Sequence, residues 1–161
     1  MARTSQGRRS ASPKKPFRWP KQYLLPMPDE YIQDLSLKHH LALAGCLTDD
    51  GNHHLLIELI RTTYLAFYLW EAGIGDATLD LFRDAEAVLD RAVLRAEVSA
   101  RWRLDVSEED AIKTVLRLHD SQIGTVSARQ FIEARARLDK LLSVEPSTSP
   151  LTRHRSRSQC S

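Results

Sequence analysis

The residues best suited to hold a metal ion lie in one stretch of the chain, KHHLALAGCLTDDGNHHLL, at residues 38–56. The stretch contains two histidine pairs and a cysteine: His39 and His40, His53 and His54, and Cys46. A zinc site needs about four such ligands around one point. Adjacent histidines on a helix point about 100° apart, and no second cysteine lies at the short spacing of structural zinc sites. We therefore interpret the stretch as a turn between two helices, with the first histidine pair at a core boundary, and expect no metal or other cofactor.

Three further polar residues fall within apolar helical patterns. His119 lies on an apolar face seven residues after Ile112, and Glu58 and Arg61 are spaced to pair at i, i+3 on one helix. We interpret His119 as a satisfied residue at the edge of the core and the other two as structural. The chain has no glycine-flanked serine, no glycine-rich phosphate loop and no cysteine next to a histidine. We expect no catalytic residue and no enzyme activity.

The elements that must position these side chains are helices. Apolar residues recur with helical spacing, and no segment alternates with period two for long, so we predict an all-α fold, a compact bundle of four to five helices. The second expected helix is apolar nearly all round, which places it at the centre of the bundle. The expected helices span about residues 29–47, 52–72, 76–103, 107–119 and 127–145.

Local signals mark several helix ends. Gly73 or Gly75 should end the second helix in a left-handed conformation, and Asp76 should start the third. Ser127 and Gln130 have the spacing of a capping box at the start of the last helix.

Size and composition indicate one soluble, cytoplasmic domain. The chain has 161 residues, of which 42% are hydrophobic and 27% charged. No apolar signal segment follows the charged start, and the longest uncharged piece of the most apolar run, residues 62–70, is far shorter than the roughly 20 residues of a membrane span. Cys46 and Cys160 do not make a disulfide framework, so we expect free thiols.

Charge is divided unevenly along the chain. Residues 1–28 hold seven basic residues and residues 146–161 hold three arginines, with no acid in either segment. Residues 29–145 hold 13 basic and 21 acidic residues, so the ends carry +10 and the helical domain −8. We predict a disordered or extended basic N-terminal arm, with prolines favouring extended structure up to Pro28, and a disordered basic C-terminal tail.

Basic arms of this kind neutralise phosphates without needing a preformed surface. Aromatic residues on either side of Arg18 are suited to stack on bases or to enter a minor groove. The candidate nucleic-acid-binding residues are Arg8, Arg9, Lys14, Lys15, Phe17, Arg18, Trp19 and Lys21. The alternative is a protein-interaction or assembly module, in which the acidic body binds a partner or self-associates through the third helix.

The last two expected helices also carry a pattern of helix, glycine-containing turn and basic helix. The expected connection, from His119 to Ser127, is longer than the three or four residues of a helix-turn-helix. The acids at residues 108–110 would also lie beside the DNA. We therefore favour the tails as the nucleic-acid contact.

Residues 25–76, LPMPDEYIQDLSLKHHLALAGCLTDDGNHHLLIELIRTTYLAFYLWEAGIGD, resemble small uncharacterised bacterial proteins labelled Fis-type transcriptional regulators. The resemblance covers about a third of the chain and implies a bacterial regulatory or accessory protein. It transfers no site residues, because the helix-turn-helix of Fis-like proteins is not recognisable in this stretch. The sequence thus predicts a non-enzymatic, DNA-binding or RNA-binding accessory or regulatory protein.

Overall fold

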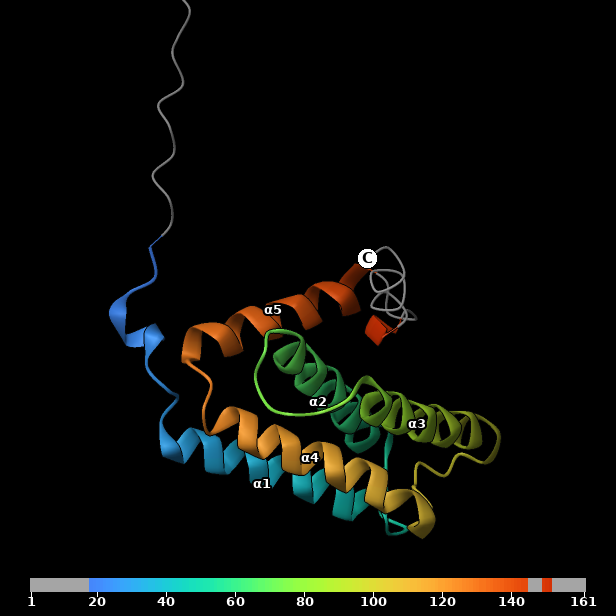
Figure 1. The fold of residues 1–161 in the computed structure, drawn as a ribbon. Helices are drawn as coiled ribbons and strands as arrows, with labels where there is room; N and C mark the ends of the chain where they lie inside the picture. Colours follow the sequence, from blue (N-terminus) through green and yellow to red (C-terminus); the bar gives the residue numbers. More distant parts are fainter. Residues whose placement is uncertain (1–17, 145–148, 152–161) are drawn as a thin grey trace, which may run out of the picture.

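The computed structural model of the chain describes residues 18–144 and 149–151. Its elements are five α-helices and two short 3-10 helices (Figure 1): η1 (Lys21–Leu24), α1 (Asp29–Cys46), α2 (His53–Glu71), α3 (Leu79–Ser99), η2 (Val106–Glu108), α4 (Glu109–Ile123) and α5 (Ala128–Val144). Across the described residues the β-pairing amounts to one isolated bridge, between Pro26 and Ser127. The prediction of an all-α bundle with four to five helices is confirmed.

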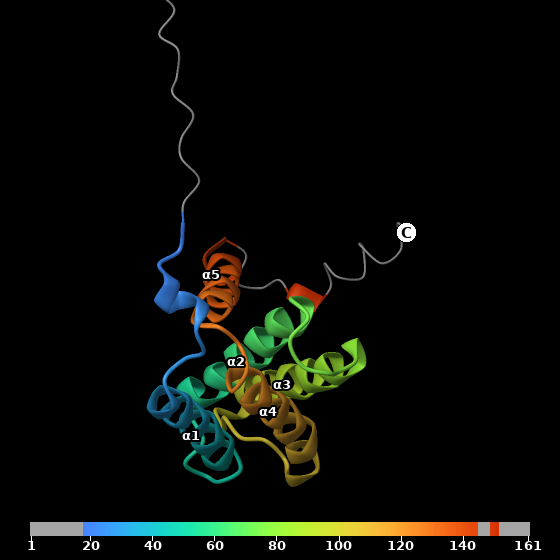
Figure 2. The same cartoon turned by 60° about the vertical axis from the view of Figure 1, so that its left-hand side comes forward.

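The central element is α2, as the sequence predicted. It packs against each of the other four α-helices. In both views α5 lies on one side of α2, while α1 and α4 lie on the other (Figures 1 and 2). A cluster of Phe67, Trp70 and Phe82, with ring centroids 5.4–5.9 Å apart, joins α2 to α3. Aromatic pairs at such separations stabilise a core beyond the area that they bury.

The start and end of α2 are set by local contacts. The side chain of Asn52 accepts hydrogen bonds from the backbone N–H groups of His54 and Leu55, which satisfies two donors of the first turn. At the other end Gly73 has a φ of 85°, and the N–H of Ile74 donates to the carbonyl of Leu69 at 3.0 Å. This is the left-handed glycine end that the sequence predicted.

The start of α3 differs from the prediction. The helix begins at Leu79, with Thr78 before it, and not at Asp76. Gly75 also has a left-handed φ, of 86°. The indole of Trp70 donates a hydrogen bond to the carbonyl of Ala77 at 3.0 Å, which holds the connection against α2 and delays the helix.

The end of α3 also comes earlier than the predicted end near Arg103. The helix stops at Ser99, and Ala100 takes a left-handed φ of 56°. Further along, Leu104 is fully buried, and its N–H donates to the carbonyl of Cys46 at 2.7 Å. To make this contact with the end of α1, the chain must turn away from the direction of α3, so the helix ends before Arg103.

The connection between α4 and α5 is shorter than predicted. The break expected after His119 is wrong, because α4 continues to Ile123. The expected capping box is present, with Ser127 N–H donating to Gln130 Oε1 and Gln130 N–H donating to Ser127 Oγ. The four-residue connection matches the length of a helix-turn-helix, but α5 packs chiefly on α2 and η1.

The described part of the N-terminal arm lies against the body. Its backbone is bonded to α5, since Ala128 N–H donates to the carbonyl of Leu25 at 2.9 Å, and Met27 is buried. The proline-rich segment was predicted to be extended, but it contains one short 3-10 helix, η1. Residues 1–17, 145–148 and 152–161, on which most of the predicted disorder falls, lie outside the described residues. The described C-terminal residue Leu151 is buried.

Candidate functional site

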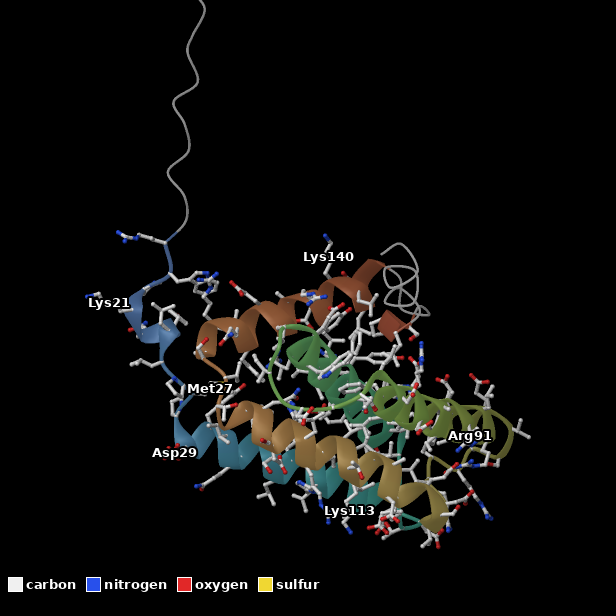
Figure 3. All side chains as sticks on the ribbon, viewed as in Figure 1. Lys21, Met27, Asp29, Arg91, Lys113 and Lys140 are labelled. Carbon is white, nitrogen blue, oxygen red and sulfur yellow. The ribbon has the colours of Figure 1, made fainter. Side chains whose placement is uncertain are left out.

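The structure describes three of the predicted nucleic-acid-binding residues. Arg18 and Lys21 are exposed and form no ion pair with any residue in the described part of the chain. Figure 3 shows Lys21 extending from η1 away from the helices. Trp19 is half-buried, and its ring meets the edge of Tyr23 at a centroid distance of 5.5 Å. The other candidates lie outside the described residues: Arg8, Arg9, Lys14, Lys15 and Phe17.

The basic side chains of the helical domain are mostly engaged with acids. Nine of its 13 lysines and arginines form ion pairs with other described residues: Lys38, Arg61, Arg83, Arg91, Arg95, Arg103, Lys113, Arg129 and Arg137. In one of these pairs the buried carboxylate of Glu108 receives two hydrogen bonds from Arg95, at 2.6 and 3.0 Å. The positive charge of the domain is thus largely neutralised within the domain.

The histidine and cysteine stretch is a turn between helices, as the sequence predicted. His53 is the first residue of α2, and its ring centroid lies 4.8 Å from that of Trp102. His40 Nε2 lies 2.8 Å from Asp120 Oδ2. Cys46 is fully buried, and burial raises the pKa of its thiol to about 11. Among the described residues no group of three or more His, Cys, Asp or Glu side chains is arranged to hold a metal ion.

His39 and His119 form a buried pair that the sequence did not reveal. Their ring centroids are 5.2 Å apart, and their exposed fractions are 3% and 0%. The prediction that His119 lies at the edge of the core is therefore wrong, because its ring is fully buried. Neither nitrogen of His119, nor Nδ1 of His39, has a hydrogen bond of good geometry among the described residues. The two residues are 80 positions apart in the chain, so only the packing of α1 on α4 brings them together.

Burial decides the protonation state of this pair. Loss of solvent lowers the pKa of His39 from 6.5 to about 4 and the pKa of His119 from 6.5 to about 3. The carboxylate of Glu58 acts on His39 in the opposite direction but does not outweigh burial. Both rings are therefore neutral at pH 7.

A polar recess of about 300 Å³ lies beside His39, between α1, α2 and α5. Glu58 Oε1 lies 2.7 Å from Lys38 Nζ and 3.5 Å from His39 Nε2. Arg61 reaches across to Asp139 of α5, at 3.1 Å. The expected i, i+3 pair between Glu58 and Arg61 is wrong, because both side chains find partners on other helices.

An apolar groove of about 400 Å³ adjoins this recess, between the N-terminal arm, α1 and α5. Met27 and Tyr31 line one side, and Ile132 lines the other. Phe131 and Arg135 line both hollows. The recess and the groove therefore meet at one arginine and one aromatic ring of α5.

Comparisons of the chain with protein-family models, with curated proteins and with solved structures found no match. None of the described helices has the length and apolar character needed to cross a membrane. Functional interpretation therefore depends on the residues and their geometry.

Proposed function

We propose that the protein binds nucleic acid through its basic ends and has no enzymatic role. The separation of charge carries this proposal. The two ends together have a net charge of +10 and the helical domain has a net charge of −8. Most lysines and arginines of that domain form ion pairs with its own acids. Arg18 and Lys21, by contrast, are exposed and unpaired within the described residues.

The attachment of the arm to α5 supports the same function. The bond between Leu25 and Ala128 and the burial of Met27 fix the root of the arm. Arg18 and Lys21 lie only a few residues before this root in the chain, so their charges start from a defined edge of the body. Phosphates bound there release counterions, while the acidic body repels the rest of the nucleic acid. Arg8, Arg9, Lys14 and Lys15 would add further phosphate contacts, and Phe17 and Trp19 would stack on bases.

A regulatory or accessory role in transcription belongs to the same proposal, as does a cytoplasmic location. The resemblance of residues 25–76 to proteins labelled Fis-type regulators supports the regulatory role. The charges of α5 favour the arms over a helix-turn-helix as the contact. Two of the four cations of α5, Arg129 and Arg137, are already paired with Glu133 and Glu71, so half of the positive charge of the helix is balanced by neighbouring acids.

Fluorescence anisotropy with a short labelled duplex and a labelled single strand, at several salt concentrations, tests the proposal. The variant R18Q/K21Q should bind more weakly than the wild type. Its slope of log K against log salt on duplex DNA should be shallower by about 0.9 for each lost phosphate contact. The matched control is R101Q/R117Q, which removes from the helical domain two exposed cations that form no ion pair with another described residue.

The control should bind like the wild type. Equal weakening of the two double variants would mean that net charge matters and the arm does not. Absence of binding by the wild type at low salt would refute the proposal.

A second candidate function is assembly through α3, because this helix exposes two large apolar side chains on one face. Leu94 and Val98 are one turn apart and are 62% and 91% exposed. Adjacent exposed apolar side chains can form part of a contact surface. In this alternative, L94Q/V98Q should convert an oligomer into a monomer in light scattering, whereas nucleic-acid binding should be absent.

A further inference from the structure

The two hollows beside α5 have a chemistry that nucleic-acid binding does not use. The polar recess and the apolar groove are continuous in their lining, since Phe131 and Arg135 belong to both. Together they place an apolar groove next to a recess lined by charged side chains. A site of this shape suits a small molecule whose two ends differ in polarity.

The charges around the hollows leave one cation unmatched. Lys38 is paired with Glu58, and Arg61 is paired with Asp139. Arg135 forms no ion pair or hydrogen bond within the described residues. His39, which also lines the recess, is neutral at pH 7. The site therefore carries a surplus of one positive charge inside a domain that is acidic overall.

A guanidinium group is well matched to a carboxylate, because its planar donors can bind both oxygens. One unmatched arginine balances a single negative charge. A phosphate monoester, with nearly two charges, would leave one uncompensated beside Glu58 and Asp139. The charge balance therefore favours a monocarboxylate.

We propose that the junction of the recess and the groove binds a small amphipathic carboxylic acid. Its carboxylate lies on Arg135, and its apolar chain lies in the groove between Met27, Tyr31 and Ile132. The groove volume of about 400 Å³ is within the range of roughly 300–1,000 Å³ found for small-molecule sites. The site shares Met27 with the root of the arm but uses none of the candidate nucleic-acid-binding residues, so its test is separate from the test of nucleic-acid binding.

The test uses octanoate and its neutral counterpart octanamide as probes of the full-length protein, by isothermal titration calorimetry. Wild-type protein should bind octanoate at least about tenfold more tightly than octanamide, as expected for a charge-assisted hydrogen bond. R135Q should lose this preference. The matched control is K140Q, because Lys140 is another exposed cation of α5 with no ion pair inside the described part of the chain, and it lines neither hollow and points away from the body (Figure 3).

A second variant tests the apolar half of the site. I132S should weaken octanoate and octanamide by similar factors, since it removes groove surface and leaves Arg135 in place. Both Arg135 and Ile132 are exposed, so these variants should keep the helical circular dichroism of the wild type. Equal affinities of the wild type for octanoate and octanamide would overturn the proposal. So would unchanged octanoate binding by R135Q, or no octanoate binding by the wild type.

Discussion

Acidification should destabilise this protein through its buried histidine pair. In the unfolded chain His39 and His119 take up protons below about pH 6.5, whereas the folded rings stay neutral until about pH 4 and pH 3. The unfolded state therefore binds more protons between these limits, and the free energy of unfolding falls as the pH falls through this window. At pH 7 the folded rings are neutral and the unfolded rings are mostly neutral, so the effect is small.

The size of the effect follows from the pKa differences. One pKa unit corresponds to about 1.4 kcal/mol, so at pH 5 each histidine lowers the free energy of unfolding by about 2 kcal/mol. The pair lowers it by about 4 kcal/mol between pH 7 and pH 5. That is a large part of the roughly 5–15 kcal/mol that stabilise a typical domain.

Urea unfolding followed by circular dichroism at pH 7 and pH 5 measures this change. H119L should lose about half of the pH dependence whatever its stability at pH 7, because one titrating group remains. The control is H53Q/H54Q, which replaces two exposed histidines in the first turn of α2 and should keep the full dependence. Equal stability of the wild type at both pH values would refute the reasoning, as would an unchanged pH dependence in H119L.

Two further substitutions test the contacts that hold the helices in place. Glu108→Gln weakens the buried pair with Arg95 and should lower the free energy of unfolding by about 2 kcal/mol; an unchanged urea midpoint would show that this pair contributes nothing. Gly73 and Gly75 both have a left-handed φ, but an added Cβ meets open space at Gly73, whereas at Gly75 it lies 2.9 Å from Leu118 Cδ1 and 3.1 Å from Cγ of the fully buried Gln122. Gly73→Ala should therefore cost about 1 kcal/mol and Gly75→Ala clearly more, and equal thermal midpoints for the two variants would contradict this.

The five helices could be predicted from the sequence because the signals for them are local. Asn52 at the start of α2, Gly73 at its end, and Ser127 with Gln130 at the start of α5 all act within a few residues. Apolar periodicity likewise identified α2 as the central helix. The separation of charge between the ends and the helical domain is also a property of the sequence alone.

The helix boundaries that were wrong depend on contacts between distant parts of the chain. Leu104 must reach the carbonyl of Cys46, so α3 ends early. His119 was expected near the end of its helix, but α4 continues to Ile123, and the added residues Gln122 and Ile123 are fully buried in the core. Local sequence contains no trace of such contacts.

The histidine pair and the hollows beside α5 were decided by tertiary structure alone. Glu58 and Arg61 have the spacing to pair with each other, yet packing places Lys38 and Asp139 nearer to them. Which cation remains unmatched, in this case Arg135, follows only from the final arrangement of three helices. Burial, which sets the protonation of His39, is likewise a property of the folded chain, because it depends on every element that covers the ring.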